Sequence, residues 1–154
     1  MRLDTGVFDA SPLIALHQIG HLALPRSLFD QSLVPSTVAG EVAPSVGTLP
    51  DWIDVRDDFV VLELPQTLDA GELAAISLAV QISADVVALD DLAGGMMAAD
   101  LGLTTTGSLG LLVKAKAAGL IDEVRPLMDA MIAHGLYASD TLYRQILAIA
   151  GEPA

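Results

Sequence analysis

The chain has 154 residues, no cysteine and a formal net charge of −13, which corresponds to an isoelectric point of about 4.2. The absence of cysteine excludes disulfides and thiolate metal sites, and the acidity disfavours a broad basic surface for nucleic acid. The apolar runs are interrupted too often to span a bilayer, and the N-terminus has no apolar leader, so we expect no membrane association and a cytoplasmic location. The length predicts a single domain over residues 1–154.

Short apolar strands alternate with helices along the chain. We expect strands at residues 5–9, 32–34, 59–64, 85–89 and 103–106. Helices are expected at residues 11–19, 36–43, 69–81, 92–101 and 108–118, followed by one around 124–132 and one that begins at Ser139. This alternation is typical of an α/β fold with a central parallel sheet of about five strands.

The first acidic candidate is Asp9, which follows the first expected strand. Ser11, with Pro12 after it, suits the start of the next helix, so Asp9 is not needed as a cap. The alternative is a carboxylate placed favourably at a helix start by the macrodipole. We interpret Asp9 as functional, because a buried charge at the end of an apolar strand is costly unless it binds something.

Three further acidic positions have a structural alternative beside the functional one. Glu72 follows Asp69 by three residues, which is the spacing of a capping box, so local structure alone can account for it. Asp90 and Asp91 end the fourth expected strand, where ligands bind in open α/β sheets, and either of them can cap the next helix. Glu41 lies on a short helix and can equally be a solvated surface charge.

Carboxylates gathered at the end of a sheet have one plausible joint use. Mg²⁺ and Mn²⁺ prefer oxygen ligands, which aspartate and glutamate supply from several elements. Such ions can generate a nucleophilic water and offset the charge of a scissile phosphate. The sequence contains no phosphate-binding P-loop and no nucleophilic serine elbow that would indicate another chemistry.

Several segments together resemble a PIN domain, and in particular the branch of uncharacterised prokaryotic PIN-like proteins allied to VapC-type toxins. The segments are Asp9-Ala10-Ser11-Pro12-Leu13, Leu68-Asp69-Ala70-Gly71-Glu72, Leu89-Asp90-Asp91 and Gly107-Ser108-Leu109-Gly110. The resemblance implies a three-layer α/β/α fold with a parallel sheet. It also implies an acidic pocket that binds Mg²⁺ or Mn²⁺, and ribonuclease activity.

The resemblance also assigns residues to this pocket. The four acidic positions of the family are matched by Asp9, Glu41, Glu72 and either Asp90 or Asp91. Hydroxyl positions beside the pocket are matched by Ser11 and Ser108. The chain departs from the branch at Gly95, where an arginine is usual, which leaves Lys114 and Lys116 as the candidates for contact with RNA phosphate or, alternatively, as solvated helix lysines.

Two functions follow as hypotheses. The first is a metal-dependent endoribonuclease that acts as the toxin of a toxin–antitoxin pair, with RNA, a basic antitoxin and a second copy of the chain as partners. The second is a catalytically weak or inactive PIN-like module that binds protein through its apolar C-terminal helices. The acidity and the missing arginine favour the second hypothesis, and the set of acids favours the first.

Overall fold

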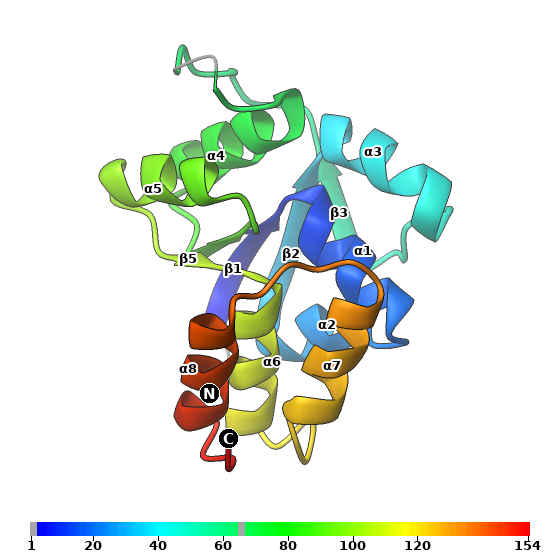
Figure 1. The fold of residues 1–154 in the computed structure, drawn as a ribbon. Coiled ribbons are helices and arrows are strands. Elements are labelled where there is room, and N and C mark those ends of the chain that lie inside the picture. The colour runs from blue at the N-terminus through cyan, green and yellow to red at the C-terminus, as the bar shows by residue number, and fades with distance from the viewer. Residues whose placement is uncertain (1–2, 65–66) are drawn as a thin grey trace.

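The computed structural model describes residues 3–64 and 67–154, and its centre is a five-stranded parallel sheet (Figure 1). The strands are β1 (Leu3–Phe8), β2 (Phe29–Pro35), β3 (Ile53–Arg56), β4 (Val86–Ala88) and β5 (Thr105–Thr106). The helices are α1 (Ala10–Gln18), α2 (Leu24–Leu28), α3 (Ser36–Val46), α4 (Ala70–Ile82), α5 (Leu92–Asp100), α6 (Ser108–Ala117), α7 (Arg125–Ala133) and α8 (Asp140–Ile149). The predicted α/β fold with about five parallel strands is confirmed.

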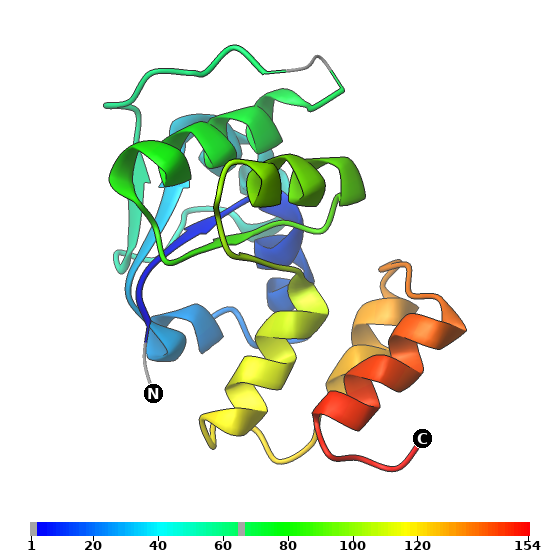
Figure 2. The ribbon, with the colours of Figure 1, turned by 90° about the vertical axis from the view of Figure 1, so that its left-hand side faces the viewer.

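Helices cover both faces of the sheet, as the predicted three layers require. Successive side chains of a strand point to opposite faces, so Val7 packs under α4 while Phe8 packs among α1, α2 and α6. Helices α4 and α5 form one layer, and α1, α2 and α6 form the other (Figure 2). The hairpin of α7 and α8 packs against α6, away from α4 and α5.

The third strand was predicted at the wrong place. Residues 59–64 form no strand, and β3 lies earlier, at Ile53–Arg56, paired with β2 at the sheet edge. Instead of joining the ladder, the backbone of Val60 exchanges hydrogen bonds with the Gln81 side chain, and the N–H of Leu62 donates to the Ser77 hydroxyl at 2.9 Å. Two side chains of α4 thus bind backbone groups of an apolar segment that the sequence pattern assigned to the sheet.

Helix boundaries differ from the prediction at some positions. Helix α1 begins at Ala10, so Asp9 and not Ser11 occupies the position before its first residue. Helix α3 continues through Pro44, and the short α2 was not predicted. Ser139 caps α8 as predicted, because its hydroxyl accepts from the Leu142 N–H at 3.1 Å. None of the helices described is both long and apolar enough to cross a membrane.

The strand order β3-β2-β1-β4-β5 places a topological switch between β1 and β4. Strands β2 and β3 lie on one side of β1 within the sheet, and β4 and β5 lie on its other side. In open parallel sheets ligands bind at the carboxyl ends of the strands that flank such a switch. Asp9 and Asp90 follow these two strands, so the fold brings the first and last acidic segments to this edge.

Candidate functional site

Asp9 stands at the carboxyl end of β1, directly beside β4. Its N–H donates to the Ala88 carbonyl at 2.9 Å, which continues the pairing of the two strands by one residue. Asp9 is only 6% exposed, and its Oδ1 atom is buried with no hydrogen-bond partner. The side chain is also not used to cap α1, although it occupies the capping position. Local structure therefore does not account for this carboxylate.

Glu72 lies in the first turn of α4 and is also 6% exposed. Asp69 caps this helix, because its Oδ1 accepts from the Glu72 N–H at 2.8 Å. The Glu72 carboxylate makes no return bond, and its Oε2 atom is buried without a partner. Only half of the capping box is thus formed, so the helix start does not explain the Glu72 side chain.

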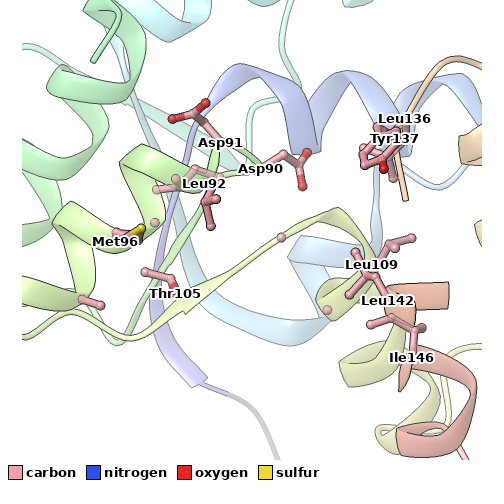
Figure 3. Close-up of a pocket in the computed structure, with 15 residues that line it drawn as sticks. Asp90, Asp91, Leu92, Met96, Thr105, Leu109, Leu136, Tyr137, Leu142 and Ile146 are labelled. Carbon is pink, nitrogen blue, oxygen red and sulfur yellow. The ribbon is translucent and has the colours of Figure 1, made fainter. Parts of the chain in front are cut away.

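The adjacent Asp90 and Asp91 have different roles. Asp91 caps α5, since its Oδ2 accepts from the Gly94 N–H at 2.8 Å. Asp90 turns to α6, where it accepts from the Ser108 N–H at 2.7 Å and from the Ser108 hydroxyl at 2.6 Å. Figure 3 shows the two carboxylates pointing in opposite directions. Ser108 is buried and orients Asp90.

Three glycines make room for three carboxylates, and this signal was missed in the sequence. A Cβ atom on Gly94 would lie 2.7 Å from Glu72 Oε2, and one on Gly107 would lie 2.9 Å from Asp90 Oδ1. A Cβ atom on Gly71 would collide with the Glu41 carboxylate. Although most of Glu41 is exposed, its carboxylate therefore packs against the first turn of α4.

Neighbouring acids raise the pKa values of Asp9, Glu41 and Glu72, which places these groups within electrostatic reach of each other's surroundings. Burial raises the pKa of Asp9 to about 6, the Ala10 N–H opposes this, and the charges of Asp69, Glu41 and Asp90 add to it. Burial also raises the pKa of Glu72 to about 8. The protonated carboxyl can donate a hydrogen bond to the Asp69 or Asp91 carboxylate, and the charges of these two groups add to the shift, whereas the ionised Glu72 has no donor at Oε2. The pKa of Glu41 is raised by burial and by Asp69.

Asp69 contributes to all three of these shifts. Sequence reasoning assigned it only the capping role, which it also fills. The electrostatic interactions of Asp69 therefore reach Asp9, Glu41 and Glu72. We define these side chains as the acidic cluster. Its members are Asp9, Glu41, Asp69, Glu72, Asp90 and Asp91.

The donor chemistry of the acidic cluster fits a hard divalent cation. All of its donors are carboxylate oxygens, and two of them, on Asp9 and Glu72, are buried without a partner. A cation would compensate these buried groups, which otherwise favour protonation. Within the described ranges, no three acidic or histidine side chains already converge as metal ligands. The ligand set remains a prediction.

The other predicted site residues are spread along the fold. Ser11 is exposed and lines a small pocket of about 260 Å³ together with Asp90. Lys114 and Lys116 lie about 9 Å and 12 Å along α6 from Ser108. The structure therefore does not bring these lysines to the acidic cluster.

Lys116 instead forms part of a tether for the C-terminus. Its Nζ lies 3.0 Å from Glu152 Oε2, and the Glu152 carboxylate also accepts from the N–H groups of Val124 and Arg125 at 2.7 and 3.0 Å. Burial raises the pKa of Glu152, but these two N–H groups and Lys116 outweigh burial and lower it to about 2. The contact joins α6, the start of α7 and the chain end.

A larger pocket of about 690 Å³ opens beside Asp90 and Asp91 (Figure 3). One wall is α5, with Leu92 and Met96, and the opposite wall is the segment between α7 and α8, with Tyr137. The remaining apolar lining comes from α6, α8 and the same segment. It includes Leu109, Leu136, Leu142 and Ile146, and Leu89 and Ala99 add to it. Asp90 lies between the two walls, so the pocket and the acidic cluster adjoin.

A comparison with protein families matches residues 5–152 to DUF3368, a PIN domain. Among solved structures, the chain is similar to a PilT N-terminus domain protein, SSO1118, from the hyperthermophilic archaeon Sulfolobus solfataricus P2. The identity is 16%, the match covers 88% of this chain and 99% of the other, and the TM-score is 0.44. No curated protein matches the chain.

Proposed function

The chain belongs to the DUF3368 family of PIN domains, and from this membership we propose that it is an endoribonuclease dependent on Mg²⁺ or Mn²⁺. The membership supports a nuclease-type fold and the use of a divalent metal. The observation that carries the proposal is the pair of buried, unpartnered carboxylate oxygens on Asp9 and Glu72 within the acidic cluster. Neither oxygen is used by the fold, and both suit a cation.

The proposed ligands are Asp9, Glu41, Glu72 and Asp90 or Asp91. A divalent ion held by these carboxylates supplies an activated water and offsets charge on the scissile phosphate. Ser108 orients Asp90 through two hydrogen bonds, and Asp69 fixes the start of the helix that carries Glu72. Burial raises the pKa of Glu72 to about 8, so binding of a cation by this carboxylate would be coupled to release of a proton.

We propose further that the enzyme is the toxin of a toxin–antitoxin pair. The supporting observation is the net charge of −13, which suits a basic antitoxin as partner. Co-expression of the chain with the product of a neighbouring reading frame tests this. Relief of growth inhibition by a basic partner supports the toxin role, and growth that the chain alone does not inhibit contradicts it.

The central test of the nuclease is Asp9→Asn. This change keeps the shape of the side chain but removes a proposed ligand, so Mg²⁺-dependent RNA cleavage should fall by more than about 100-fold. Asp100→Asn, an exposed position at the end of α5, is the matched control and should cleave as the parent does. Equal cleavage by Asp9→Asn and the parent would refute the proposal.

The second candidate function is a non-catalytic protein-binding module. It is favoured by one observation, which is that the pocket beside Asp90 is lined by no lysine or arginine. Calorimetric titration of Mn²⁺ separates the two functions. Binding that is lost in Asp9→Asn supports the nuclease, and no binding at millimolar Mn²⁺ supports the module.

A further inference from the structure

The 690 Å³ pocket has the dimensions of a small-molecule site, since such pockets span roughly 300–1000 Å³. The side chains that form its two walls are exposed to solvent. Tyr137 is 84% exposed, and Leu92 and Met96 on the facing wall are 77% and 62% exposed. Exposed apolar side chains that face one another across a cleft are unusual unless something occupies the space between them.

The pocket offers nothing that would hold a phosphate by charge. None of its 15 lining residues is lysine or arginine, and two of them are the acids Asp90 and Asp91. The whole chain has only seven basic residues. Of these, Arg56 is paired with Asp54 and Asp58, and Lys116 is paired with Glu152. A polyanion therefore gains little electrostatic affinity from this protein.

The same pocket is well suited to the uncharged part of a nucleotide. A nucleobase has flat apolar faces that stack on aromatic side chains, and this contact requires no cation. Tyr137 presents such a face, and the methionine thioether of Met96 on the other wall adapts to a flat ring. Asp90, a member of the acidic cluster, lies between the walls (Figure 3). A base bound in the pocket would therefore bring its own phosphate toward the acidic cluster.

We propose that this pocket binds one unpaired nucleobase next to the scissile phosphate, with Tyr137 stacking on it. The inference rests on the proposed ribonuclease function and assigns a binding site to one part of its substrate, the base next to the cleaved bond. A base inside a duplex is already stacked and paired, and it cannot enter the pocket without leaving the helix. Stacking takes the place of the phosphate contacts that the acidic surface lacks.

The test combines a change in the protein with a change in the RNA. Single-stranded RNA with one abasic position, moved stepwise past the cleavage site, is cleaved by the parent and by Tyr137→Ala in Mg²⁺. For the parent, one abasic position should raise KM about tenfold. Tyr137→Ala should show that tenfold loss with intact RNA and no further loss with abasic RNA.

Two control variants support the interpretation. Met96→Ala removes the facing wall and should show a partial loss of the same kind. Ile149→Ala changes an apolar side chain of α8 that is 69% exposed and lies outside the pocket lining, so it should behave as the parent does. Because Tyr137, Met96 and Ile149 are all exposed, these changes leave the core intact.

The outcomes separate this inference from the function on which it rests. Cleavage that is insensitive to abasic positions, or equal sensitivity in the parent and Tyr137→Ala, overturns the base pocket and leaves the nuclease standing. Either result would instead assign the pocket to an apolar segment of a protein partner. If the parent cleaves no RNA, the proposed function fails, and fluorescence anisotropy with the same strands in EDTA decides the pocket. Tyr137-dependent preference for the intact strand supports it, and its absence overturns it.

Discussion

Two adjacent glycines in α5 should respond oppositely to the same substitution. Gly94 and Gly95 both lie in the first turns of the helix, and alanine at either position favours the helical backbone. At Gly95 a Cβ atom meets nothing within 4 Å. At Gly94 it would lie 2.7 Å from Glu72 Oε2 and 2.9 Å from Leu89 Cδ1, closer than real Cβ atoms approach.

The expected free energies of unfolding follow from these contacts. Gly95→Ala gains about 0.5–1 kcal/mol from reduced backbone freedom in the unfolded chain. Gly94→Ala gains the same amount but overpacks against the buried Leu89 and Glu72, which costs about 1–3 kcal/mol. The first variant should be more stable than the parent, and the second less stable by up to about 2.5 kcal/mol. For a chain of this length, each kcal/mol moves Tm by about 2–4 °C.

Thermal denaturation of both variants in EDTA measures this difference without the contribution of metal. Calorimetric titration of Mn²⁺ then tests the site, because a displaced Glu72 carboxylate should weaken binding in Gly94→Ala and leave it unchanged in Gly95→Ala. In a Glu72→Ala background the cost of Gly94→Ala should shrink, since one of its two clashes is gone. Equal Tm changes for the two glycines would refute the argument that Gly94 makes room for Glu72.

Three other substitutions test separate parts of the molecule. The pKa of Glu72 is raised from 4.5 to about 8, so the folded state binds this proton more tightly than the unfolded chain does. The resulting contribution to the free energy of unfolding is complete below pH 4.5 and is lost as the pH rises through 8. Glu72→Gln should therefore gain Tm relative to the parent across this range in EDTA, and a pH-independent difference would contradict the burial argument. The pKa of Glu152 is lowered from 4.5 to about 2, so its stabilisation is present above 4.5 and is lost as the pH falls toward 2. Glu152→Gln should lower the free energy of unfolding by about 1–3 kcal/mol at neutral pH and leave it unchanged near pH 2. If thermal denaturation shows the same difference between variant and parent at both pH values, the tether with Lys116 is contradicted. Gly95→Arg should tighten binding of single-stranded RNA, measured by fluorescence anisotropy with Gly95→Ala as the control. The slope of the logarithm of the binding constant against the logarithm of the salt concentration should steepen by about 0.7 per phosphate contacted. An unchanged slope would show that the new cation contacts no phosphate.

The sequence predicted the order of the main elements because their signals are local. Alternating apolar strands and capped helices are visible within ten to twenty residues, and most of them appear in the structure where expected. The failure at residues 59–64 has a different cause. Those residues are apolar enough for a strand, but Gln81 and Ser77, some twenty residues later, bind their backbone instead. Nothing in the segment itself signals this partner.

The candidate site was predictable in part, for the same reason. Asp9, Glu72 and the Asp90–Asp91 pair stand out because each ends or begins an apolar element. The contribution of Asp69 to the cluster was hidden, since its capping role already explained it. Gly94 was hidden as well. Its lack of a side chain matters only because Glu72 from another helix approaches it.

The structure also changes the meaning of Gly95. The resemblance to PIN-like proteins implies an arginine at this position, and with it a contact to RNA phosphate. In the fold, Gly95 lines the apolar pocket beside Asp90, and the space that a side chain would take is open. The same residue thus removes a cation and leaves an apolar surface accessible. Binding of a base uses that surface and does not need the cation, which reconciles a nuclease-type fold with a chain of net charge −13.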